Sequence, residues 1–100
     1  MTIEVSTNNE TATIKIIGRF DFSSQRDFRN AYQNQEHSVT EYIVDLSQTE
    51  YIDSSALGML LLLKEHVESK NGHSKLSQPA PEIKKILTMS NFDQLFAISD

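Results

Sequence analysis

The sequence predicts a mixed α/β fold in which a sheet of about four strands carries helices. Segments with apolar side chains at every second position, typical of strands, interleave with segments whose apolar residues recur at helical spacing. Glycine and proline are few and spread along the chain, which indicates one domain with short connections. The expected order over residues 1–100 is strand, strand, helix, strand, helix, strand, helix.

The expected strands differ in how clearly their patterns show. Residues 3–5 and 12–16 alternate between apolar and polar side chains around a polar turn, which predicts a hairpin, and Gly18 is expected to end its second strand. Residues 42–46 are almost continuously apolar and β-rich, which is typical of a central strand covered on both faces. Residues 74–78 contain a single apolar side chain and are expected to form a short strand.

The first and last helices have recognisable starting residues. Ser24 with Asp27 three positions later resembles a capping box, which predicts a helix over residues 24–36. Pro81 suits the first residue of the last helix, and Asn91 suits a left-handed residue after it. The expected buried stripe of the first helix is Phe28, Ala31 and Tyr32. The residues expected to pack the C-terminal tail are Phe92, Leu95, Phe96 and Ile98.

The middle helix begins with the most informative residues of the chain. Asp53, Ser54 and Ser55 precede an apolar-periodic run over residues 56–67, which predicts a helix start at these positions. The first backbone N–H groups of a helix lack partners within it and, with the helix dipole, favour an anion. Two interpretations are open at this point: the serines and the acid cap the helix and do nothing else, or a serine here is phosphorylated as a switch.

The middle helix also carries more leucines than one buried stripe needs. At about 100° per residue, Leu61 and Leu62 fall outside the stripe, and Gly58 and Glu65 lie almost opposite it. The surplus leucines either are covered by the sheet or form a contact patch near the serines. The residues expected in the stripe are Ala56, Leu57, Met59, Leu60, Leu63 and Val67.

Composition excludes several classes of function. The formal charge of −5 makes the chain a poor candidate for binding the phosphate backbone of nucleic acids. There is no cysteine for disulfides or thiolate chemistry, and the three histidines lack metal-ligand spacing. No apolar run approaches the length of a membrane span, and the N-terminus lacks the features of a secretory signal. We therefore expect a cytoplasmic protein without membrane insertion, cofactor, metal or catalytic residues.

The segment Ile52–Gly58 resembles the signature of the STAS domain, as found in bacterial anti-sigma factor antagonists. Three other segments are also similar to that family. Residues 18–21 resemble its turn after the second strand, residues 44–46 resemble its strand before the signature, and residues 79–98 resemble its closing segment. The resemblance covers nearly the whole chain and implies one STAS domain over residues 1–100.

The resemblance implies a partner-switching regulator. In such families an anti-sigma factor that is itself a serine kinase phosphorylates the second serine of the signature, and a PP2C-type phosphatase removes the phosphate. The unmodified form binds the anti-sigma factor and frees a sigma factor. Carried onto this chain, Ser55 is the phosphoacceptor with Ser54 as the fallback, and Asp21 is implied to lie near it. The residues expected to contact the partner are Asp21, Asp53, Ser54, Leu57, Gly58, Leu61 and Leu62.

Two alternatives stay open. Small STAS proteins also serve, without phosphorylation, as accessory subunits of ABC-type lipid transport complexes, and the exposed leucines would suit that role too. A nucleotide or other small anion at the helix start is the weaker alternative, because nothing in the sequence supplies recognition of a base or ribose.

Overall fold

The computed structural model describes residues 2–100 and confirms the mixed α/β fold. Its strands are β1 (Thr2–Asn8), β2 (Thr11–Phe20), β3 (Glu41–Asp45), β4 (Thr49–Ile52), β5 (His73–Ser77) and β6 (Ala97–Ser99). Its helices are α1 (Gln25–Gln33), α2 (Ser54–Ser69) and α3 (Pro81–Met89), with two short 3-10 turns, η1 (Phe22–Ser24) and η2 (Phe92–Gln94).

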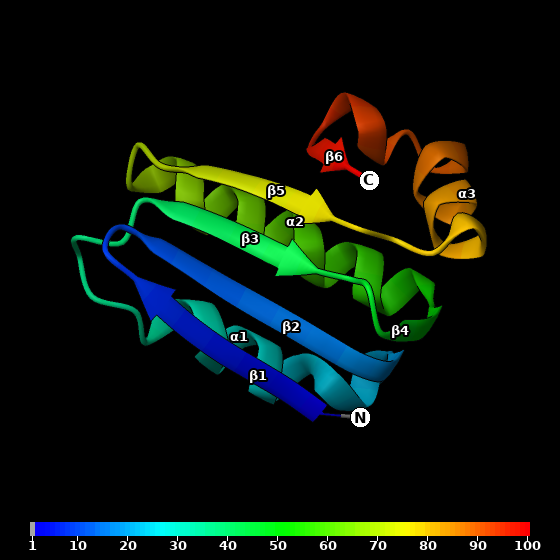
Figure 1. Ribbon diagram of the computed structural model, residues 1–100, viewed down its shortest axis with the longest axis horizontal. Helices are drawn as coiled ribbons and strands as arrows, with labels where there is room; N and C mark the ends of the chain where they lie inside the picture. Colours follow the sequence, from blue (N-terminus) through cyan, green and yellow to red (C-terminus); the bar gives the residue numbers. More distant parts are fainter. Residues whose placement is uncertain (1) are drawn as a thin grey trace.

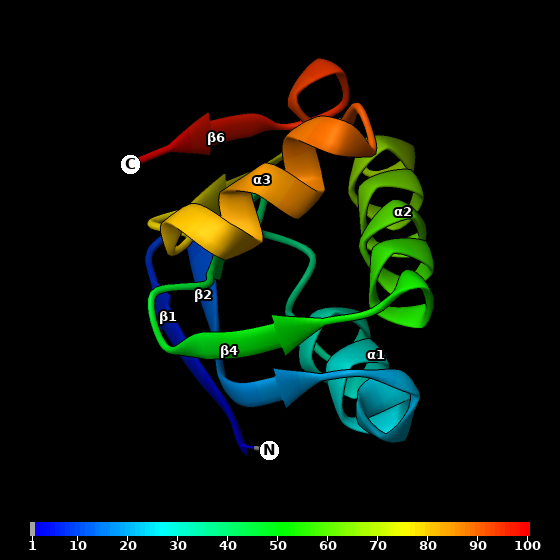
Figure 2. The same cartoon turned by 90° about the vertical axis from the view of Figure 1, so that its right-hand side faces the viewer.

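The strands form one six-stranded mixed sheet in the order β1-β2-β3-β5-β6, and β4 pairs with the end of β2. The predicted hairpin is confirmed, because β1 and β2 pair antiparallel, while the other pairs are parallel. Helices α1 and α2 lie side by side on one face of the sheet, and no helix within residues 2–100 lies on the opposite face (Figures 1 and 2).

This one-sided arrangement corrects the expectation for the central strand. Tyr42 and Val44 of β3 are buried under the helices, but Ile43 and the two acids of the strand are only half-buried on the open face. Because both crossover helices pack on the same face, the strand is covered on one side only. Its apolar run reflects the half-buried Ile43 and not a second helical layer.

Gly18 does not end the second strand, as we had expected, but lies inside β2. Its φ of 93° lies in a region that glycine adopts readily, and the register of β2 shifts between Gly18 and Arg19. Residues 11–15 of β2 pair with β3, and residues 18–20 pair with β4. The glycine therefore bends the strand and lets it continue to Phe20, which positions the residues that follow.

Two short strands, β4 and β6, were not predicted. The four residues of β4 and the three of β6 are too short for alternation to distinguish them from turns. The first helix is also shorter than predicted, because residues 22–24 form the η1 turn and α1 ends at Gln33.

Other local expectations are confirmed. Pro81 begins α3, Asn91 has a left-handed φ of 61°, and Gly72 closes α2 by donating its N–H to the carbonyl of Val67 at 2.9 Å. Leu95 is 41% exposed, so it does not pack the tail as expected. The predicted stripes of α1 and α2 are buried, apart from the half-buried Leu57. Within residues 2–100, no helix is long and apolar enough to cross a membrane.

Candidate functional site

Two neighbouring parallel strands end together and place two aspartates at one edge of the fold. Phe20 at the end of β2 pairs with Ile52 at the end of β4, and the N–H of Asp53 donates to the carbonyl of Phe20 at 3.4 Å. Asp21 and Asp53 follow this pair, so both acids lie where the strands lead into η1 and α2. Figure 2 shows the ends of β2 and β4 side by side. The expectation that Asp21 lies near the serine signature agrees with this geometry.

Asp53 caps helix α2. It keeps an extended backbone, with φ of −113°, and its Oδ1 accepts the N–H of Ala56 at 2.9 Å. This satisfies one of the helix N–H groups that have no partner within the helix. Within residues 2–100, no other side chain forms a hydrogen bond at the start of α2. The hydroxyls of Ser54 and Ser55 are therefore not used to hold the turn.

Asp21 holds the neighbouring turn in a different way. Its Oδ1 accepts hydrogen bonds from the N–H of Ser23 at 3.1 Å and from the Ser23 hydroxyl at 2.6 Å. The hydrogen bond from the Ser23 hydroxyl lowers the pKa of Asp21 below its usual value, and the Ser23 backbone N–H and then the Arg19 guanidinium at 3.6 Å lower it further. The Arg19 guanidinium also lies 4.0 Å from the centre of the Tyr51 ring. Asp21 is therefore a carboxylate fixed in the turn.

The predicted capping box has different members. The hydroxyl of the fully buried Ser24 accepts the N–H of Asp21 at 3.4 Å, while Asp21 accepts from the turn. The box is thus Asp21 with Ser24, and Asp27 takes no part in it. The prediction was wrong because two acids lie three residues from Ser24. Asp21 precedes it and Asp27 follows it, and the hydroxyl of Ser24 pairs with Asp21.

The serines of the signature lie at the surface. Ser54 is exposed and Ser55 is half-buried in the first turn of α2. Ser55 borders a hollow of about 260 Å³ between η1, α1 and α2. The residues lining this hollow are Phe22, Gln25, Ser55, Gly58, Met59 and Leu62. We call it the Ser55 hollow.

Two of the predicted contact residues, Gly58 and Leu62, line the Ser55 hollow together with the predicted phosphoacceptor Ser55. The other predicted contact residues do not line it. Leu62 is 52% exposed. Leu61 is 42% exposed but lies outside the hollow, and Leu57 is half-buried against the core. Asp21, Asp53 and Ser54 lie at the same edge but do not line the hollow.

Phe22 is a residue of this site that the sequence reasoning missed. It is 66% exposed, more than any other aromatic residue within the described part of the chain, and it forms a wall of the Ser55 hollow. A signal existed: Phe22 directly follows Asp21 and precedes the predicted helix, where no buried stripe requires an aromatic side chain. A large exposed apolar group beside a half-buried serine favours contact with another protein.

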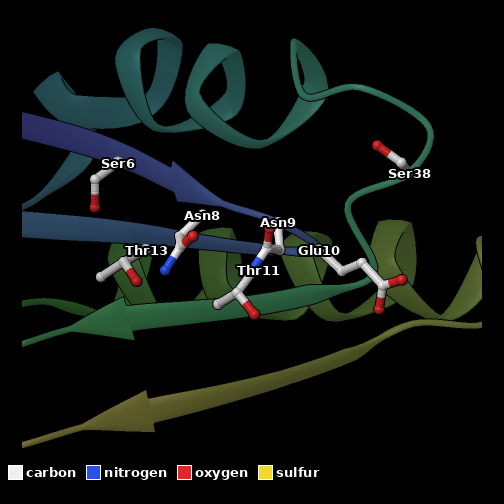
Figure 3. A pocket seen from close by; sticks show the side chains of 7 residues that line it. All are labelled: Ser6, Asn8, Asn9, Glu10, Thr11, Thr13 and Ser38. Carbon is white, nitrogen blue, oxygen red and sulfur yellow. The ribbon is translucent and has the colours of Figure 1, made fainter.

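A larger hollow lies at the opposite end of β2 (Figure 3). It has a volume of about 780 Å³ and is lined by polar residues of the β1–β2 hairpin and by Ser38. Because a β-strand rises about 3.3 Å per residue, this end of β2 lies about 30 Å from Asp21. Within residues 2–100, no three His, Cys, Asp or Glu side chains are grouped as a metal site. Because the larger hollow contains no residue of the serine signature, the Ser55 hollow is the better candidate site.

A family model described as "Mlab, STAS domain" matches residues 3–98. The chain belongs to the STAS domain family. A STAS-domain containing protein of Pseudomonas aeruginosa (strain UCBPP-PA14) is 49% identical over 94 residues, which cover 94% of this chain and 93% of that protein. The resemblance drawn from the sequence is thereby confirmed for the family.

Several solved structures share this fold. The anti-sigma factor antagonist SpoIIAA in its unphosphorylated form matches with a TM-score of 0.82 at 21% identity, covering 99% of this chain and 89% of that one. A putative anti-sigma factor antagonist of Thermotoga maritima matches with a TM-score of 0.82 at 18% identity, covering 98% and 86%. A sulfate transporter family protein of Wolinella succinogenes matches with a TM-score of 0.83 at 16% identity, covering 95% and 80%. The same fold is therefore found in an anti-sigma factor antagonist and in a protein of the sulfate transporter family.

Proposed function

We propose that this STAS protein is an anti-sigma factor antagonist that works by partner switching. In its unmodified form it binds a serine-kinase anti-sigma factor, and phosphorylation of Ser55 releases it. A PP2C-type phosphatase then restores binding. The chain acts by binding in the cytoplasm and carries out no catalytic step itself, so it is a substrate of the two enzymes.

One observation carries this proposal: Ser55 is a half-buried serine in the first turn of α2 whose hydroxyl is not used to cap the helix. Asp53 already caps α2, so modification of Ser55 leaves that bond intact. The N-terminal end of α2 also stabilises a phosphoryl group through its free N–H groups and dipole. Phosphorylation at this position therefore changes the surface without unfolding the protein.

The charge around Ser55 explains how phosphate would expel a partner. A phosphoserine adds about −1.5 to −2 charge, next to an edge that already holds the carboxylates of Asp21 and Asp53. None of the residues lining the Ser55 hollow is basic. A partner surface that fits the neutral serine would have to desolvate this new charge with no basic side chain of the Ser55 hollow to pair with it, and affinity is then lost.

Gly58 supports a contact at this hollow. A Cβ at Gly58 would meet nothing within 4 Å, so packing within the chain does not require glycine there. Glycine in a helix interior costs about 0.5–1 kcal/mol relative to alanine. Its position in the Ser55 hollow, between Ser55 and Leu62, suits the close approach of a partner to the α2 backbone.

The test uses the purified chain and the serine-kinase anti-sigma factor of the same organism. The two are mixed with and without ATP, and the complex is followed by size-exclusion chromatography with intact-mass analysis. Wild type is expected to gain one phosphoryl group and dissociate, while Ser55→Ala stays bound. Ser54→Ala is the matched control and should behave as wild type. Equal ATP-dependent release of Ser55→Ala and wild type would contradict the proposal.

The second candidate function is that of a non-phosphorylated accessory subunit of an ABC-type lipid transport complex. The observation favouring it is the exposure of Leu61 and Leu62, which are 42% and 52% exposed on one helix. Stable co-purification with an ABC ATPase, together with no phosphopeptide containing Ser55, would favour this candidate. Loss of that association in Leu61→Lys and its retention in Ser55→Asp would support it further.

A further inference from the structure

The two outer edges of the sheet are built differently. At one edge, β6 is only three residues long. At the other, β1 spans seven residues in unbroken register with β2 and contains neither proline nor lysine (Figure 1). Open strand edges pair with other chains unless short length, bulges, proline or charged side chains prevent it. The β6 edge is protected by its short length, whereas the one feature of this kind in β1 is the charged side chain of Glu4.

The hairpin geometry identifies which backbone groups of β1 are free. Asn8 and Thr11 pair on either side of a two-residue loop in which Asn9 has a φ of 57°. In such a hairpin the flanking residues form a hydrogen-bonded pair, and hydrogen-bonded pairs then alternate along the ladder. Alternation assigns the N–H and C=O groups of Ile3, Val5 and Thr7 to the open edge.

We propose that β1 pairs antiparallel with β1 of a second copy of this chain, about a two-fold axis through Val5. In this register Val5 faces Val5 of the other copy, and Ile3 faces Thr7. The backbone N–H and C=O groups of these three residues point to the open edge. In this register, those of each copy form hydrogen bonds with those of the other. The proposal concerns a surface other than the Ser55 hollow and does not depend on phosphorylation.

The charges and apolar groups of β1 suit this register. Glu4 is the one charged residue of the strand, and it faces Ser6 of the other copy, so the two Glu4 carboxylates are never opposite each other. Within its own sheet Glu4 pairs with Lys15. Val5 is 41% exposed although it pairs with the buried Ile14, so pairing would cover an apolar side chain that lies at the edge of the core.

The end of β1 is held in place on the helix side. The Thr7 hydroxyl donates to Oε1 of Gln35 at 3.0 Å, and Nε2 of Gln35 donates to the carbonyl of Ala31 at 3.0 Å. This links the strand to the end of α1. The Ser55 hollow contains no residue of β1, so a dimer formed at this edge leaves the hollow open to a partner.

The first experiment is sedimentation velocity of the purified chain over a concentration series. Wild type is expected to show a concentration-dependent dimer, and Val5→Lys should raise its dissociation constant at least ~10-fold by placing two ammonium groups opposite each other. Val5→Pro tests the backbone directly, since it removes an outward N–H only, and edge strands tolerate proline there. Leu61→Lys, at a residue of similar exposure on α2, is the control that should leave the dimer unchanged.

A second readout uses the absence of cysteine in the natural sequence. Val5→Cys is expected to form a disulfide-linked dimer on mild oxidation much faster than Leu61→Cys, although the exposed fractions of the two native side chains are 41% and 42%. A wild type that stays monomeric up to millimolar concentration would overturn the proposal. So would equal oxidation rates of the two cysteine variants, or a dimer that Leu61→Lys breaks and Val5→Lys does not.

Discussion

The turns that lead into α1 and α2 start alike and use their serines differently. Each follows one strand of the pair joining Phe20 and Ile52, and each begins with an aspartate cap in extended backbone, with φ of −139° at Asp21 and −113° at Asp53. In the first turn, Ser23 donates to Asp21, and the buried Ser24 completes a capping box. In the second turn, Asp53 alone holds the helix start, and the serines remain at the surface.

This difference separates structural serines from a serine available for modification. Both turns contain an acid and two serines near a helix start, so residue type alone does not distinguish them. The burial and the hydrogen bonds of the serines distinguish the two turns. Ser24 is fully buried, whereas Ser55 is half-buried beside an apolar hollow. Under the proposed function, a kinase reaches Ser55 in the folded chain, whereas the fully buried Ser24 would require the first turn to open.

The largest expected effect comes from placing a charge at Ser55. Ser55→Asp should weaken binding of the anti-sigma factor by about 100-fold, because a desolvated unpaired charge at an interface costs several kcal/mol. Isothermal titration calorimetry measures the affinity. Ser69→Asp, at the far end of α2, is the matched control and should leave affinity within about twofold, since it lies outside the proposed contact. Equal losses in the two variants would remove the special role of the first turn.

The next largest effect distinguishes the two kinds of serine by stability. Ser24→Ala should lower the free energy of unfolding by about 1–3 kcal/mol, because the N–H of Asp21 loses its acceptor next to a buried site. Ser55→Ala should stay within about 0.5 kcal/mol of wild type. Urea unfolding followed by circular dichroism measures both. If Ser55→Ala destabilises the chain as much as Ser24→Ala, then Ser55 is a structural residue.

Gly58→Ala should change stability and binding in opposite directions. The free energy of unfolding is expected to rise by about 0.5–1 kcal/mol, because alanine favours helix and the added Cβ meets no atom within 4 Å. Affinity for the anti-sigma factor should fall because the methyl group enters the Ser55 hollow. Thermal unfolding and calorimetry test the two halves. A variant that is more stable and binds as wild type does would show that the partner does not approach α2 here.

The smallest expected effect is a pH dependence of the free energy of unfolding. It arises at His66, where α2 packs against α1 at the end away from Ser55. His66 packs against Tyr32, with ring centres 5.1 Å apart, and burial, followed by the charge of Lys70, lowers the pKa of His66 below 6.5. The folded state therefore binds fewer protons than the unfolded state. The contribution of His66 to stability is present above pH 6.5 and is lost as the pH falls through its folded pKa.

Urea unfolding at several pH values measures this dependence. His66→Gln should flatten the loss of stability below pH 6.5. An unchanged profile in His66→Gln would assign the pH dependence to other groups. Because this site lies toward the end of α2, the variant should leave binding at the Ser55 hollow intact.

The sequence allowed the order of the main elements to be predicted, because their periodic patterns are long enough. The stripe of α2 and the position of Asp53 before it are examples. The strands β4 and β6 have four and three residues, and their pairing depends on partners distant in the chain. The bend at Gly18 was likewise hidden, since a glycine after a strand pattern also suits a strand end.

The candidate site could be predicted in part. The signature around Ser55 is local in sequence, so its residues were identified directly. Phe22 was missed because its role depends on the pairing of Phe20 with Ile52, which brings η1 beside α2. The capping box was assigned to Ser24 with Asp27 because sequence spacing cannot show that the Ser24 hydroxyl turns back toward Asp21.

The most direct test maps the phosphate on the chain recovered from its own cells. An affinity-tagged copy is isolated under conditions that inhibit phosphatases, and its peptides are sequenced by tandem mass spectrometry. The account predicts phosphate on Ser55, with Ser24 unmodified, and no anti-sigma factor bound to the phosphorylated fraction. Phosphate on another serine, or a phosphorylated Ser55 in the fraction still bound to the anti-sigma factor, would contradict it.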